Sequence, residues 1–98
     1  MNPEQEKLWT KYKLAEMAGS CTRWHNEGEL NPDGQPGPDL VTLRIPRKRF
    51  DYHRARALSY TMLKLLSAGE RLKAPPLRVV ENPDDYVLTY QVVKTTEE

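Results

Sequence analysis

The side chains with the strongest intrinsic chemistry are one cysteine and two histidines. Cys21 and His25 are four residues apart, and His53 lies in a separate part of the chain. Nucleophilic catalysis needs a thiol or hydroxyl within hydrogen-bond reach of a base, and a structural zinc site needs paired ligands in both of its halves. Neither pattern is complete, so we predict no catalytic residue, no metal site, no cofactor and no enzymatic activity.

Phosphate-binding loops and carboxylate pairs do not change this interpretation. The glycines at 28, 34 and 37 neither follow a predicted strand nor open a helix, which a nucleotide-binding turn requires. Asp84 and Asp85 lie in a predicted tight turn, and turn formation accounts for them. The sequence therefore favours a binding protein over a catalyst.

A basic segment, Arg44 to Arg56, is the most unusual part of the chain. It reads RIPRKRFDYHRAR and holds six basic residues and one acid, a net charge of +5, whereas the remaining nine basic and 13 acidic residues give −4. The segment leads into a predicted helix, whose free N–H groups and positive dipole end also attract anions. Cations there slightly destabilise a helix, so their presence predicts a surface that binds a negatively charged partner.

Helical spacing extends this surface beyond the segment, because Arg56, Tyr60 and Lys64 fall at i, i+4 and i+8 on one face. We expect a basic ridge on the solvent side of the helix. The predicted ridge consists of Arg44, Arg47, Lys48, Arg49, Tyr52, His53, Arg54, Arg56, Tyr60 and Lys64.

Three interpretations of the ridge follow. Its arginines can pair with the chain's own acids, for which the sequence offers Glu27, Glu29, Asp33 and Asp39. They can meet an acidic partner protein, which the net charge of only +1 favours over nucleic acid. They can also hold nucleic acid or a phosphorylated ligand through residues 44–56, with tyrosines stacking on bases. We expect a protein partner first and the polyanion second.

Two helices are predicted. The first runs from Pro3 to Ala18, since Asn2-Pro3-Glu4-Gln5 combines an N-cap, a proline at the first helical position and a capping-box glutamine. The second runs from about 52 to 68 behind Asp51 as its cap. Its predicted buried stripe consists of Ala55, Leu58, Met62, Leu65 and Leu66.

Residues 19–39 read as a long loop, because they hold four glycines and three prolines. Long loops in small domains often bind partners, and Trp24 and His25 are the candidate contact residues. A strand is predicted over 40–45 from its alternating pattern. A hairpin follows, with strands over 77–81 and 86–94 around Asn82-Pro83-Asp84-Asp85.

The expected fold is therefore a single small α+β domain over 1–98. Its order is an N-terminal helix, the long loop, then β-α-β-β, with a three-stranded sheet packed against the central helix. A crossover through that helix predicts that its two flanking strands run parallel. We expect 95–98 to fray, and the second face of the sheet to be covered by the first helix or by a second copy, which predicts a homodimer.

Composition and the cysteine count indicate the class of protein and its cellular compartment. With 98 residues, 38% hydrophobic and 30% charged, the chain is typical of a folded soluble domain. No apolar run approaches the roughly 18 residues needed to cross a bilayer, so no membrane contact is expected. A single cysteine cannot form an internal disulfide, and the N-terminus lacks the pattern of a secretory signal. We therefore expect a cytoplasmic protein.

Overall fold

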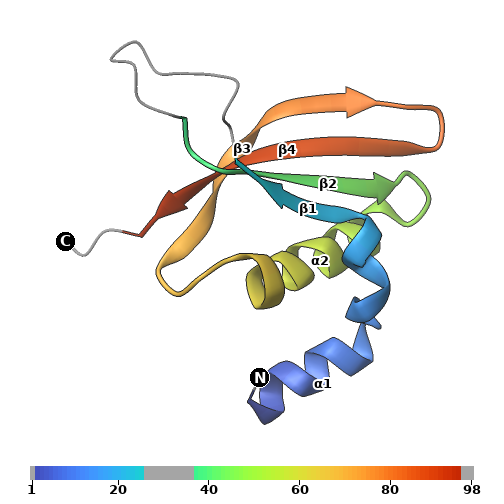
Figure 1. The fold of residues 1–98 in the computed structure, drawn as a ribbon. Helices are drawn as coiled ribbons and strands as arrows, with labels where there is room; N and C mark the ends of the chain where they lie inside the picture. The colour runs from blue at the N-terminus through green and yellow to red at the C-terminus, as the bar shows by residue number, and fades with distance from the viewer. Residues whose placement is uncertain (1, 26–36, 96–98) are drawn as a thin grey trace.

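The protein folds as one antiparallel sheet with its helices on one side (Figure 1). The computed structural model describes residues 2–25 and 37–95. In chain order the elements are α1 (Pro3–Lys11), the 3₁₀ helix η1 (Leu14–Gly19), β1 (Cys21–Trp24), β2 (Leu40–Pro46), α2 (Phe50–Tyr60), the π-helical turn η2 (Thr61–Leu65), β3 (Glu70–Glu81) and β4 (Asp85–Lys94). The α+β class predicted from the sequence is confirmed.

The sheet has four strands in the order β1-β2-β4-β3, so the prediction of three strands is wrong. The additional strand is β1, which lies inside the predicted loop 19–39 and pairs with β2 from Cys21 opposite Leu43 to Trp24 opposite Leu40. Its four residues alternate between buried and exposed side chains, but they are too few to stand out beside a glycine- and proline-rich stretch. Residues 26–36 lie outside the described part of the chain.

The strands that flank α2 run in the same direction but are not neighbours. Both β2 and β3 pair antiparallel with β4, which lies between them. The predicted hairpin is present as β3 and β4, and β3 begins at Glu70, seven residues earlier than expected. The outer edge of β3 is unpaired among the described strands, and its pairing with β4 is interrupted by a bulge between Lys73 and Arg78.

The core lies between the helical side of the sheet and α2. Val41, Leu43 and Ile45 of β2 have no exposed surface, and Tyr90 of β4 is buried beside them. Ala57 of α2 is also fully buried, and its small side chain lets the helix lie close to the sheet.

The buried face of α2 differs from the prediction. Ala57, Tyr60 and Thr61 are buried, whereas Ala55 is exposed and Met62 is 69% exposed. The predicted stripe assumed uninterrupted α-helical spacing through residue 68, but the helix changes to a π turn at Thr61 and ends at Leu65. Leu58, Leu65 and Leu66 of the predicted stripe are half-buried at the edge of the core.

The first helix begins as predicted and ends earlier. Asn2 accepts a hydrogen bond from the Gln5 backbone N–H at 2.9 Å, and the Gln5 side chain accepts one from the Asn2 N–H at 3.1 Å. The α-helix stops at Lys11 rather than Ala18, because Lys13 adopts a left-handed backbone conformation with φ of 49°. α1 itself has no buried residue, and Trp9 attaches it to α2 by stacking on Tyr60 at 5.6 Å between ring centroids.

An ion-pair network around Arg23 joins β1 and β3, the two edge strands of the sheet. Its guanidinium donates to both carboxylate oxygens of Glu70 at 2.7 and 3.0 Å, to Asp39 at 3.0 Å and to the Leu65 carbonyl at 2.9 Å. The three charged side chains are each less than a quarter exposed. The network therefore fixes the start of β3 against β1 and against the end of η2.

We expect this network to make the protein sensitive to acid. Hydrogen bonds from Arg23 and the Ser67 N–H lower the pKa of Glu70 from 4.5 to about 2, and hydrogen bonds from His25 and Arg23 lower the pKa of Asp39. A lowered folded-state pKa gives stability that is present above the unfolded-state value and is lost as the pH falls through the folded-state value. Urea unfolding midpoints should therefore decrease from about pH 4.5 towards pH 2.

The matched variants are Glu70→Gln and Glu81→Gln. The first should flatten the pH dependence, because it removes the ionisable group that Arg23 binds. The second removes an exposed carboxylate of the same strand and should keep the wild-type profile. Identical profiles for wild type and Glu70→Gln would contradict the assignment.

Candidate functional site

The turn between β2 and α2 holds the basic segment in a defined position. The Arg47 backbone N–H donates to the Asp84 carbonyl at 3.0 Å, and its Nε donates to the Asn82 carbonyl at 2.8 Å. The Arg47 guanidinium also lies over the Tyr86 ring, 4.7 Å from its centroid. The turn is thus attached to the β3–β4 hairpin, and Arg47 is held against it.

Arg49 is the N-cap residue that precedes Phe50, the first residue of α2, and it adopts a left-handed conformation with φ of 57°. Its guanidinium lies 4.4 Å from the centroid of the Tyr52 ring, which is itself 38% exposed. Asp51 was predicted to cap this helix but lies within its first turn, and no side chain caps the helix. Four exposed cations, which we call the turn surface, gather here: Arg47, Lys48, Arg49 and Arg54.

The charges of the turn surface are not neutralised by carboxylates of the described residues, since the ion pairs found there involve other cations. Among the acids predicted to pair with this segment, Asp39 bonds instead to Arg23 and His25. Glu27, Glu29 and Asp33 lie outside the described residues. Arg44 is 66% exposed and 3.7 Å from Asp85, on the side of the sheet away from the helices.

Arg56 and Tyr60 do not belong to an exposed ridge, so their predicted placement is wrong. Arg56 is 9% exposed, and it donates to the carbonyls of Tyr12 at 2.7 Å and Lys13 at 3.2 Å. Tyr60 is 6% exposed. Their spacing matches one face of α2, but this face is turned towards η1 and the core because the small Ala57 packs on the sheet. Lys64 is exposed, as predicted.

His53 lies behind the turn surface and contributes no positive charge to it. The ring is half-buried, and its Nδ1 lies 3.3 Å from Nη1 of Arg56. Burial lowers the pKa of His53, and the charges of Arg56 and Arg49 lower it further. The imidazole is therefore neutral at pH 7 and can accept a hydrogen bond from Arg56.

The two candidate residues from the predicted loop are far from the turn surface. The Trp24 indole Nε1 donates to Oγ1 of Thr42 at 3.0 Å, and Nδ1 of His25 lies 2.9 Å from Asp39. Both residues lie beside Leu40, where β2 begins, whereas Arg47 follows Pro46, where β2 ends. Six residues of strand, about 20 Å, separate the two places. The turn surface and the described ends of the predicted loop therefore form two separate surfaces.

Cys21 is buried and faces the core. Its thiol is 3% exposed and lies 3.8 Å from the Ala57 carbonyl, facing α2. Burial raises the pKa of Cys21 to about 11, so the thiolate is scarce at neutral pH. Within residues 2–25 and 37–95, no three side chains of His, Cys, Asp or Glu gather as metal ligands would.

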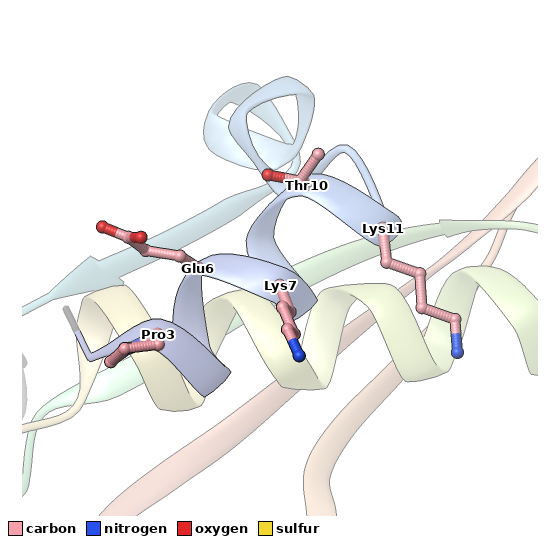
Figure 2. Close-up of a pocket in the computed structure, with 5 residues that line it drawn as sticks. All are labelled: Pro3, Glu6, Lys7, Thr10 and Lys11. Atoms are coloured by element: carbon pink, nitrogen blue, oxygen red, sulfur yellow. The ribbon is translucent and has the colours of Figure 1, made fainter.

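A hollow of about 550 Å³ lies along α1 and not at the turn surface. It is lined by Pro3, Glu6, Lys7, Thr10 and Lys11, all from this one helix (Figure 2). Figure 2 shows the ammonium groups of Lys7 and Lys11 extending in the same direction, away from the Glu6 carboxylate. One helix face does not enclose a ligand, so this hollow lacks the convergent walls of a small-molecule site.

Three exposed cations of β3 were missed by sequence reasoning. Arg71, Lys73 and Arg78 lie on the side of the sheet away from the helices. The alternation Glu70-Arg71-Leu72-Lys73 is the signal that reveals them, because half-buried side chains alternate there with exposed ones. The strand was expected only from residue 77 because Pro75 and Pro76 interrupt the pattern.

No family model, curated protein or solved structure matches the chain. Among the described residues, no helix is long and apolar enough to cross a membrane. The function is therefore inferred from the chain's own surfaces.

Proposed function

We propose that the protein is a small, non-enzymatic binding protein that contacts an acidic surface of a partner protein through the turn surface. The observation that carries this proposal is a set of four exposed cations without carboxylate partners among the described residues. Such a protein acts as an adaptor, an inhibitor or an accessory factor, since occupying a partner's surface needs no catalytic group. The predicted loop contacts stay a separate expectation, because Trp24 and His25 lie at the other end of β2.

The fixed geometry of the turn supports a folded protein partner. Arg47 and Arg49 lie over tyrosine rings, and the backbone of the turn is bonded to the β3–β4 hairpin. Holding an arginine in place before binding reduces the entropy lost on association. An exposed tyrosine beside arginines is also typical of the residues that dominate protein interfaces.

The test is a reversal of charge on the turn surface. Arg47→Glu with Arg49→Glu should weaken capture of a defined protein partner from native host extract at least tenfold, since like charges then face each other. Recovery of the partner is measured by quantitative mass spectrometry and then by titration with the purified partner.

The matched control is Lys7→Glu with Lys11→Glu on α1, which changes the net charge by the same amount on exposed side chains. The control should bind as the wild type does. Equal losses in both variants, or no loss in the first, would refute the turn surface as the interface.

Nucleic acid or a phosphorylated ligand bound through residues 44–56 is the second candidate. It is favoured by the segregation of charge along the chain, since residues 44–56 hold six basic residues and one acid. Affinity for a labelled oligonucleotide should then fall steeply with salt and be lost in the Arg47→Glu, Arg49→Glu variant. Affinity insensitive to both changes would exclude this candidate.

The proposal includes a cytoplasmic location, supported by a lone buried thiol without a disulfide partner. A homodimer stays a prediction, to be measured by sedimentation of the purified chain.

A further inference from the structure

The side of the sheet opposite α2, which we call the open face, is not covered by any described element (Figure 1). The strand register places its side chains in rows across the sheet. One row runs Thr22, Thr42, Thr89 and Arg78, and the next runs Trp24, Leu40, Gln91 and Lys73. Rows on one face are about 6.7 Å apart, and neighbouring strands are about 4.8 Å apart. Leu40 and Thr89 in these rows are buried, with 4% and 8% exposure, so the accessible side chains of the open face lie chiefly on its two edge strands, β1 with Trp24 and β3 with its cations.

Cations dominate the charge of the open face. Arg71, Lys73 and Arg78 follow one another along β3, and Arg44 lies two strands away on β2. The three β3 cations are exposed and form no ion pair with a described residue. By the register, the one described carboxylate on this face is Asp85 at the start of β4, which accepts a hydrogen bond from Asn82 and lies near Arg44.

Two features of the open face suit unpaired bases. Trp24 is 41% exposed, and its hydrogen bond to Thr42 holds the indole against the sheet, where a base can stack on it. The bulge in β3 leaves a hollow of about 270 Å³ lined by Lys73, Pro75, Pro76, Leu77 and Gln91. This volume is below the roughly 300–1,000 Å³ of small-molecule sites. Its apolar walls and one carboxamide suit a single base, which Gln91 can meet with a donor and an acceptor.

We propose that the open face binds single-stranded nucleic acid. Phosphates lie along Arg71, Lys73 and Arg78, one base enters the hollow beside Gln91, and another stacks on Trp24. Charge complementarity selects this occupant over a second copy of the chain, which would bring two sets of cations together. Stacking and a base-sized hollow select an unpaired strand over a duplex, whose bases are already stacked on one another.

The experiment measures binding of fluorescein-labelled 12-nucleotide poly-dT and poly-rU by fluorescence anisotropy over a range of salt concentrations. Three or four phosphate contacts predict a slope of about −2 to −3 in log K against log salt. Arg71→Glu with Arg78→Glu should weaken binding at least tenfold and reduce the slope by about 1.4. Nucleic acid should quench the tryptophan fluorescence of the wild-type protein, and Trp24→Phe should remove most of that quenching.

Controls separate this proposal from the proposed function. Lys7→Glu with Lys11→Glu, which changes the net charge equally on α1, should keep oligonucleotide affinity within about twofold, and Arg71→Glu with Arg78→Glu should keep capture of the protein partner. Loss of oligonucleotide affinity in Arg47→Glu with Arg49→Glu but not in Arg71→Glu with Arg78→Glu would assign nucleic acid to residues 44–56 instead. Circular dichroism checks folding, and Arg71→Gln with Arg78→Gln provides a milder pair if the reversal unfolds the protein.

Several results would overturn the proposal. One is the absence of oligonucleotide binding by the folded wild type, and another is an oligonucleotide affinity that is unchanged in both β3 variant pairs. A third is an affinity for polyglutamate equal to that for the oligonucleotides, which would assign the open face to an acidic polypeptide. A concentration-dependent dimer that Val80→Glu on this face dissociates, without oligonucleotide binding, would assign it to a second copy.

Discussion

Replacing Arg23 with alanine should lower the free energy of unfolding by about 3 kcal/mol. The side chain is the shared donor to Glu70, Asp39 and the Leu65 carbonyl, and it is 24% exposed. Removing it leaves two neighbouring carboxylates in a largely desolvated site and one carbonyl without its donor. Urea unfolding followed by circular dichroism measures the loss at pH 7.

The same variant should also lose much of the acid sensitivity described above, because Glu70 then lacks the hydrogen bond that chiefly lowers its pKa. The control is Arg71→Ala, which removes an exposed arginine next to Glu70 on β3 and should change stability by less than about 0.5 kcal/mol. Equal stability of Arg23→Ala and Arg71→Ala would refute the structural role of the network.

Replacing Arg56 with alanine should cost about 2–3 kcal/mol and loosen the N-terminal helix. The guanidinium satisfies the Tyr12 and Lys13 carbonyls where the chain leaves α1, and α1 has no buried residue of its own to replace that contact. Hydrogen exchange measured by mass spectrometry should show the amides of 3–12 exchanging faster than those of β2 and β4. Urea unfolding measures the total loss in the free energy of unfolding.

Two further variants test the geometry at Arg56. Arg56→Lys should restore only part of the lost stability, because one ammonium lacks the fork that reaches two carbonyls at once. Arg54→Ala removes an exposed arginine from the same helix and should leave both stability and exchange near the wild type. Full rescue by lysine would mean that charge alone, and not the forked geometry, holds α1.

Local signals in the sequence predicted the elements whose chemistry is complete within a few residues. The capping box at Asn2 and Gln5 marks the start of α1, and the Asn82-Pro83-Asp84-Asp85 turn marks the β3–β4 hairpin. The alternation over 40–45 identifies β2, which has a fully buried face. Each of these depends on neighbouring residues alone.

Features that depend on distant partners were not predictable in the same way. β1 is stabilised as a strand by its pairing with β2, and Arg56 is buried because two carbonyls some 43 residues earlier in the chain accept its hydrogen bonds. An arginine within a basic segment looks like its exposed neighbours until those partners are known.

The candidate site was predictable in part. Clustered charge located the turn surface at Arg47, Lys48, Arg49 and Arg54, all of which are exposed. The stacking of Arg47 on Tyr86 joins residues 39 positions apart and needed the fold. The open face could not be found without the fold, because its cations come from two strands and become one surface only through the register of the sheet.

The interruption of β3 has a consequence for how the molecule behaves at high concentration. Regular, unpaired strand edges recruit strands from other molecules and start fibrils. Here Pro75 and Pro76 lack the N–H groups that such recruitment uses, and lysine and arginine side chains flank the bulge. The exposed Leu77 and Val79 therefore lie on a strand that we expect to be a poor template for polymerisation into cross-β aggregates.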